Sequence, residues 1–184
     1  MKIRTKDFIL VSLFAALTAV GAFITISLGA VPITLQLLFT LLSGILLGGN
    51  LGALSQIVYV ALGLIGLPIF AGGKSGVGII FSPTFGFLIG YIVCAFVVGT
   101  LCKNFTTKKK ISLFNVLLTC TLGVILVYLL GVPYMYLILT RINKVSMTFI
   151  GALKAGCLIF LPGDCLKILF SSLLAVKIIP AIKS

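Results

Sequence analysis

The sequence predicts an all-α membrane protein that crosses the bilayer six times and forms a single domain over residues 1–184. Of its residues, 61% are hydrophobic and only 9% are charged, whereas soluble domains are about half apolar and about a quarter charged. The apolar residues also form long runs, as in polytopic membrane proteins. These runs are expected to be helical, because open sheets would leave unpaired backbone groups in lipid.

The runs have about the length of spanning helices, for which roughly 17–25 residues is usual. Proline or glycine stands at most of the breaks between them. The tract from Tyr134 to Phe160 is less apolar and carries Arg141, Lys144 and Lys154. The six expected spans are residues 8–30, 34–50, 51–67, 84–101, 111–130 and a last one that starts after Gly163 and continues to about Ile179.

The positive charges predict the orientation of the chain. With the N-terminus inside, nine Lys and Arg residues fall in cytoplasmic segments and four in outer segments. Because cytoplasmic loops are enriched in positive charge, both termini are expected in the cytoplasm and the protein in the cell membrane. The net charge of +12 is thus explained by topology. No nucleic-acid partner is expected, because aromatic and basic residues do not alternate as in nucleic-acid-binding surfaces.

Several function classes are excluded by residues that the chain lacks. It has no His and no Glu, and its only acids are Asp7 and Asp164. Catalysis by His, HExxH metal sites and carboxylate relays are therefore absent, and the five cysteines form no CxxC pair. We expect no catalytic residue, metal or cofactor, and hence no enzyme.

The stretch FAGGKSGVGIIF (70–81) contains Gly73-Lys74-Ser75, which resembles the end of a phosphate-binding loop. The full motif needs a glycine five residues before Gly73, where this chain has Pro68. The stretch also lies between membrane spans, on the outer side. It is glycine-rich and apolar, so we expect it to fold back over the helices as a lid. An ordinary connection between helices is the alternative.

Two charges near the start of the last span are unusual in this chain. Asp164 follows Pro162-Gly163, and Lys167 is three residues further, on the same helical face. Charges within the apolar zone are costly and usually functional. A local ion pair that neutralises itself is the structural alternative, and the two interpretations are compatible. We expect Asp164 and Lys167 to bind a polar head group. Gln36, Phe70, Phe87 and Tyr91 are further candidates because they fall at the same depth.

Small residues line one stripe of the first span, with Ala15 and Ala19 four residues apart at its centre. Small residues at this spacing let helices approach closely in lipid. The stripe is either a packing surface within the bundle or a docking surface for another membrane protein.

From Val31 onward the sequence resembles the BioY family, the biotin-specific S components of energy-coupling factor (ECF) transporters. The stretches that carry the resemblance are VPITLQ (31–36), GLIGLPIFAGGKSGVG (63–78), SPTFGFLIGY (82–91) and FLPGDCLK (160–167). The resemblance implies a six-helix S-component fold with a vitamin pocket near the outer face, and biotin contacts at Asp164 and Lys167. It also implies docking through Ala15 and Ala19, which match an Ala-x-x-x-Ala motif of S components.

The expected function is therefore capture and transport of biotin, without a cofactor of its own. The expected partners are the lipid bilayer, an energy-coupling transmembrane subunit and two ATP-binding subunits. Asp164 is expected at the ureido ring. Lys167, Lys154 and Lys74 are all candidates for the biotin carboxylate, and contact of Lys167 with the ureido carbonyl is the alternative for that residue. The alternatives are a solitary biotin carrier, an S component for another vitamin, and a membrane-embedded enzyme, which would need a nucleophile with a base or a metal cluster.

Overall fold

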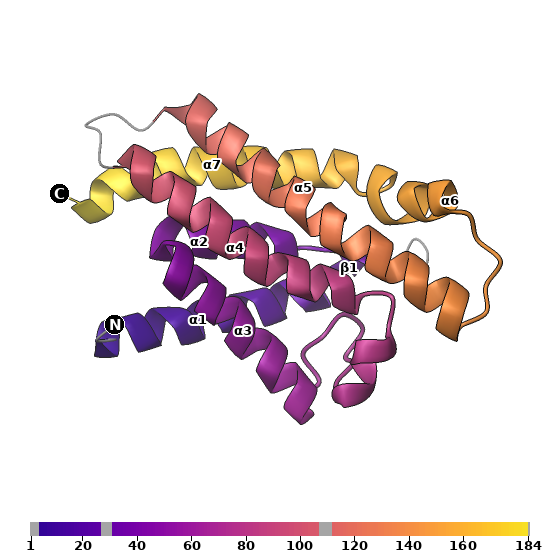
Figure 1. Cartoon of the computed structure of the whole chain (residues 1–184). Helices are drawn as coiled ribbons and strands as arrows, with labels where there is room; N and C mark the ends of the chain where they lie inside the picture. The colour runs from indigo at the N-terminus through magenta and orange to yellow at the C-terminus, as the bar shows by residue number, and fades with distance from the viewer. Residues whose placement is uncertain (1–3, 27–30, 107–111, 184) are drawn as a thin grey trace.

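The computed structural model describes residues 4–26, 31–106 and 112–183. Helices run back and forth along one long axis, and both ends of the chain lie at the same end of the bundle (Figure 1). The six passes are α1 (Thr5–Phe23), α2 (Gln36–Leu47), α3 (Gly49–Ile65), α4 (Phe85–Thr106), α5 (Leu113–Leu137) and α7 (Leu161–Lys183). The shorter elements are β1 (Thr25–Ile26), β2 (Ile33–Thr34), η1 (Val77–Phe81), η2 (Ile138–Ile142), α6 (Phe149–Leu153) and η3 (Lys154–Leu158).

The passes differ in length. Within the described ranges, three helical segments are long and apolar enough to cross a membrane: α1, α4 over Phe85–Lys103, and α5 with η2 over Leu113–Ile142. A fourth crossing is broken, because α6 with η3 meets α7 at a bend of 40°. The remaining two, α2 with 12 residues and α3 with 17, are apolar but short. The six expected spans are thus present as six helical passes.

The predicted end of the first span was wrong. Helix α1 ends at Phe23 instead of Ala30, and the chain then turns back through β1, which pairs antiparallel with β2. The pair aligns Thr25 with Thr34, and the Leu35 amide donates to the Gly21 carbonyl at 3.0 Å. The residues after the helix are rich in β-branched side chains, which favour strands over helices. A hydropathy run alone does not separate the two.

Two proline-containing breaks were also predicted wrongly. Helix α5 continues through Pro133 to Leu137, seven residues beyond the expected end at Leu130. Proline is tolerated within membrane helices because neighbouring groups satisfy the freed carbonyl. Helix α7 starts at Leu161 and includes Pro162 and Gly163. Proline is compatible with the first turn of a helix, where the missing N–H has no partner in any case.

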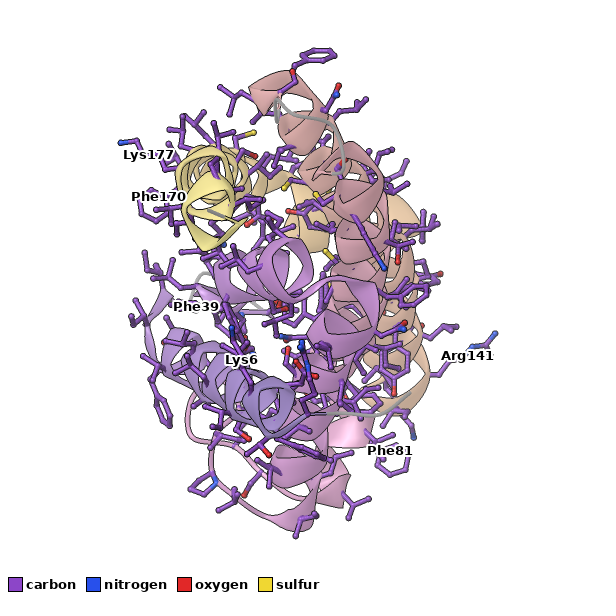
Figure 2. The ribbon with its side chains drawn as sticks, turned by 90° about the vertical axis from the view of Figure 1, so that its left-hand side faces the viewer. Lys6, Phe39, Phe81, Arg141, Phe170 and Lys177 are labelled. Atoms are coloured by element: carbon purple, nitrogen blue, oxygen red, sulfur yellow. The ribbon has the colours of Figure 1, made fainter. Side chains whose placement is uncertain are left out.

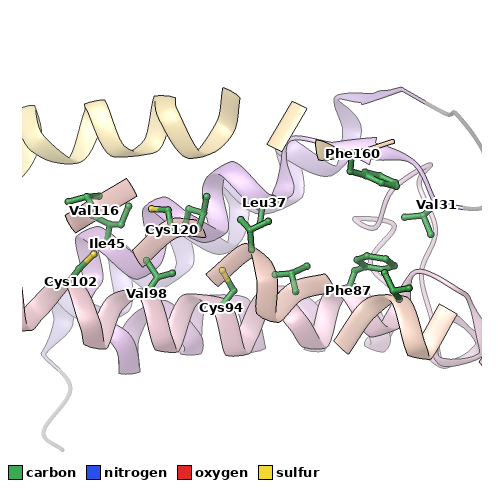
Figure 3. Packing of buried hydrophobic residues seen from close by; sticks show 14 of the residues in the cluster. Val31, Leu37, Ile45, Phe87, Cys94, Val98, Cys102, Val116, Cys120 and Phe160 are labelled. Carbon is green, nitrogen blue, oxygen red and sulfur yellow. The ribbon is translucent and has the colours of Figure 1, made fainter. Parts of the chain in front are cut away.

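The main hydrophobic core runs along the bundle between α2, α4, α5 and α7 (Figure 3). At one end of it lie Cys102 and Val116, and at the other Phe87, Phe160 and Val31. Exposed apolar side chains cover the outside, as expected in lipid: viewed from the end that holds both termini, Phe170 of α7 points outward and is 54% exposed (Figure 2).

A polar network fastens α1, α2 and α3 together inside the bundle. Its centre is Gln56, which is fully buried. The Gln56 amide donates to Thr18 of α1 at 3.2 Å and to Ser43 of α2 at 3.3 Å, and it accepts a hydrogen bond from Thr40 at 3.2 Å. Since buried polar groups are costly without partners, this network stabilises one particular packing of the three helices.

Candidate ligand-binding site

The centre of the candidate site is a buried ion pair at the start of α7. Lys167 Nζ lies 2.7 Å from Asp164 Oδ1, and the two side chains are only 8% and 6% exposed. The first turn of α7 brings them together, since the Asp164 amide donates to the Phe160 carbonyl at 2.9 Å. The expected local pair is therefore present. Charged side chains within membrane helices are rare and costly, so this buried pair is a candidate for a functional site.

A third polar group completes this cluster, and the sequence did not point to it. The Tyr128 hydroxyl of α5 donates to Asp164 Oδ2, so each carboxylate oxygen has its own donor. Tyr128 belongs to no motif. Its one signal in the sequence is that it carries the sole polar side-chain group between Leu122 and Val132.

Two small cavities adjoin one another at this end of the bundle. The inner one, of about 30 Å³, contains the ion pair in its wall, together with Tyr128, Thr34, Tyr91 and apolar residues. The outer one, of about 40 Å³, lies under the segment from Phe70 to Ile79. Four residues line both: Val31, Pro32, Phe87 and Tyr91.

All six residues predicted for the ligand site line these cavities. Asp164 and Lys167 line the inner cavity. Gln36 and Phe70 line the outer one, and Phe87 and Tyr91 line both. The Phe87 ring faces that of Phe160 at 6.5 Å between centroids, close to Val31 (Figure 3). The structure thus gathers residues from α2, α4, α7 and a loop into one region.

Gln36 links the floor of the outer cavity to the loop above it. Its side-chain amide donates to the Tyr59 hydroxyl at 2.7 Å, and that hydroxyl donates to the Ile69 carbonyl at 3.1 Å. The side-chain oxygen Oε1 of Gln36 accepts a hydrogen bond from the Thr34 hydroxyl at 2.9 Å. The Phe70 ring packs edge-on against Tyr59, with centroids 5.6 Å apart. These bonds hold α2, α3 and the start of the loop in one arrangement.

The glycine-rich stretch folds back against the helices and forms part of the wall of the outer cavity. Gly72, Gly73 and Gly76 have φ of 75°, 70° and 85°, which only glycine adopts easily. These turns fold the loop onto itself, so that the Phe70 amide donates to the Lys74 carbonyl at 3.1 Å. Phe70, Ala71, Lys74 and Ile79 then line the cavity. Of the three lysines considered for a ligand carboxylate, Lys167 and Lys74 line these cavities and Lys154 lines neither.

The alanine stripe of α1 packs inside the bundle. Ala15 is 4% exposed and belongs to a cluster with Tyr59 and Val60 of α3, against which Ala19 also packs. Ala15 and Ala19 thus take part in packing within the bundle. The exposed face of α1 carries two other small residues, Ser12 and Ala16, whereas Ala22 is fully buried.

The fold and the candidate site define a class of protein: a helical membrane protein with a polar cluster buried at one end of its bundle. The sequence matches the BioY family over residues 1–184. By this match the chain belongs to the BioY family, a family of transporters and not of enzymes.

Individual relatives and a solved structure agree with this membership. The chain is 37% identical over 182 residues to the "Probable biotin transporter BioY" of Lysinibacillus sphaericus, covering 98% of this chain and 90% of the relative. It is 36% identical over 173 residues to the "Biotin transporter BioY" of Thermotoga maritima, covering 94% and 95%. The crystal structure of the S-component for biotin from an ECF-type ABC transporter superposes with a TM-score of 0.82 at 28% identity, covering 94% of this chain and 90% of that one.

Proposed function

We propose that this chain is the biotin-binding S component of an ECF transporter and that it captures biotin at the cluster of Asp164, Lys167 and Tyr128. The observation that carries the proposal is the burial of this cluster in a cavity wall, in a chain of the BioY family.

Biotin matches the two cavities chemically. Its ureido ring offers two N–H donors and one carbonyl acceptor, which suit Asp164 and Lys167 at the inner cavity. Its fused rings are largely apolar and suit the aromatic side chains of Phe87 and Tyr91, which line both cavities. Its carboxylate suits a cation, and Lys74 lines the outer cavity. Lys167 lies so close to Asp164 that both groups serve the same end of the ligand.

Capture requires the loop to move. The cavities measure about 40 and 30 Å³, whereas sites for small molecules usually measure roughly 300–1,000 Å³. The segment from Phe70 to Ile79 covers the outer cavity, so its outward displacement makes room for biotin and its return shields the bound vitamin from water.

The chain works with an energy-coupling transmembrane subunit and two ATP-binding subunits, and both of its termini lie in the cytoplasm. Two observations support this arrangement: both ends of the chain lie at one end of the bundle (Figure 1), and the Lys and Arg residues favour that end as cytoplasmic. ATP hydrolysis takes place in the partners. Because Ala15 is buried, docking uses the exposed face of α1 with Ser12 and Ala16.

Calorimetric titration of the purified chain with biotin, thiamine and riboflavin tests the substrate. We expect binding of biotin alone and a loss of more than 100-fold in affinity for Asp164→Asn. Asp7→Asn is the matched control, since Asp7 is the chain's other acid and pairs with the exposed Arg4. Unchanged affinity in Asp164→Asn, or preferential binding of another vitamin, would contradict the proposal. A solitary carrier is recognised by biotin uptake in a host without coupling subunits.

A further inference from the structure

Tyr128 holds the carboxylate of Asp164 in place from a different helix. The two residues are 36 positions apart, on α5 and α7, and the Tyr128 hydroxyl donates to Oδ2. Lys167 occupies the other oxygen, Oδ1, at 2.7 Å. With one donor on each oxygen, rotation of the carboxylate breaks two hydrogen bonds at once. Asp164 is therefore fixed in orientation before any ligand arrives.

The same hydrogen bond lies in the wall of the site. Tyr128 and Asp164 line the inner cavity on one side. On the other side they line an apolar groove of about 400 Å³ between α5, η3 and α7, which opens on the outer surface of the bundle beside exposed residues such as Ile125 and Leu161. The two side chains thus lie between the inner cavity and the groove on the outer surface.

The pattern of donors and acceptors is matched to a cyclic urea. An ionised carboxylate has about four lone-pair sites, of which Lys167 and Tyr128 occupy two. The two that remain, with a lone pair of the Tyr128 oxygen, are acceptors for N–H groups of a ligand. Lys167 keeps two further N–H donors for a carbonyl oxygen.

From this geometry we propose that Tyr128 is a positioning residue of the site, which orients Asp164 toward the two N–H groups of the ureido ring and leaves Lys167 to its carbonyl. The inference rests on the proposed function, because it takes biotin as the ligand.

The test combines affinity with a spectroscopic signature of Asp164. In the Asp7→Asn background Asp164 is the only aspartate, and the chain has no Glu, so ¹³C-labelled aspartate gives one side-chain carboxylate band in the infrared spectrum. We expect Tyr128→Phe to shift this band and to weaken biotin binding about 10-fold, as for the loss of one hydrogen bond to a charged group. The affinity for desthiobiotin, which keeps the ureido ring, should fall by the same factor in Tyr128→Phe. Tyr136→Phe, two turns further along α5, is the control and should change neither quantity.

The possible results separate clearly. If Tyr128→Phe binds biotin more weakly but the Asp164 band does not shift, Tyr128 has only a structural role. If the band shifts but the affinity for biotin is unchanged, Tyr128 has no part in recognition. Either result overturns the inference. Biotin added to the chain with native Tyr128 should itself shift the band, and this holds as a test if the Tyr128 variant does not fold. If the unaltered chain fails to bind biotin while Tyr128→Phe still shifts the band, the proposed function fails and the positioning of Asp164 stands.

Discussion

The ring of Phe70 in the covering loop lies on the backbone of Gly63 in α3, so closely that a Cβ at Gly63 would come within 2.2 Å of Phe70 Cζ. The ring is 3% exposed and is fixed from the side by Tyr59. The missing side chain of Gly63 thus leaves room for this ring, which is one of the contacts that hold the loop on the helices.

Gly63→Ala should displace Phe70 toward the outer cavity, because no real Cβ tolerates a contact of 2.2 Å. We expect biotin affinity to fall about 10-fold, by analogy with the 1–3 kcal/mol cost of overpacking. Calorimetric titration measures the change. Gly78→Ala, in the same connection but with no atom within 4 Å of the added Cβ, is the control and should bind as tightly as the unaltered chain. Equal affinities in both variants would show that the loop does not need this contact.

Removal of the ion pair should separate stability from binding. Asp164→Asn alone leaves the buried Lys167 charge unpaired, which typically costs about 3–5 kcal/mol. The double variant Asp164→Asn with Lys167→Met removes both charges and should melt at a higher temperature than Asp164→Asn. It should still not bind biotin. Thermal unfolding in detergent and titration with biotin measure the two effects, and a double variant that melts below Asp164→Asn would argue against this account of the pair.

Lys74 should act on one group of the ligand only. Lys74→Met is expected to weaken the binding of biotin about threefold to tenfold, since an exposed charge pair contributes little more than about 1 kcal/mol. The binding of biotin amide, which has no carboxylate charge, should be unchanged. The difference should shrink at high salt. Lys154→Met is the control, because Lys154 lines neither cavity. An equal loss for both ligands would mean that Lys74 supports the loop and not the carboxylate.

Docking should depend on the exposed face of α1. Ala16→Trp adds bulk to that face and is expected to abolish co-purification with the energy-coupling subunit while biotin still binds. Leu118→Trp, on the exposed surface of α5 at 52% exposure, should leave the complex intact. If Ala16→Trp assembles normally, the partner contacts another surface.

The sequence predicted best the helices that hydropathy identifies and the site residues that are charged. Apolar runs identify the six passes, and Asp164 and Lys167 stand out because so few residues in this chain are charged. The breaks were harder, because a proline such as Pro133 interrupts a helix in water but is accommodated between membrane helices. Tyr128 was missed because its role depends on α5 lying beside α7, a contact that no local pattern encodes. The role of the small residues of α1 stayed open for the same reason: such residues indicate close packing but not which partner they pack against.

The network around Gln56 has a consequence for how the protein is made. As it leaves the ribosome, α3 brings a fully polar amide into the bilayer, and the partners of that amide on Thr18 and Thr40 belong to helices synthesised earlier. Gln56 therefore completes its hydrogen bonds to α1 and α2 only when all three helices have come together. The N-terminal half should consequently assemble as one unit during translation, before α4 and α5 emerge to complete the bundle.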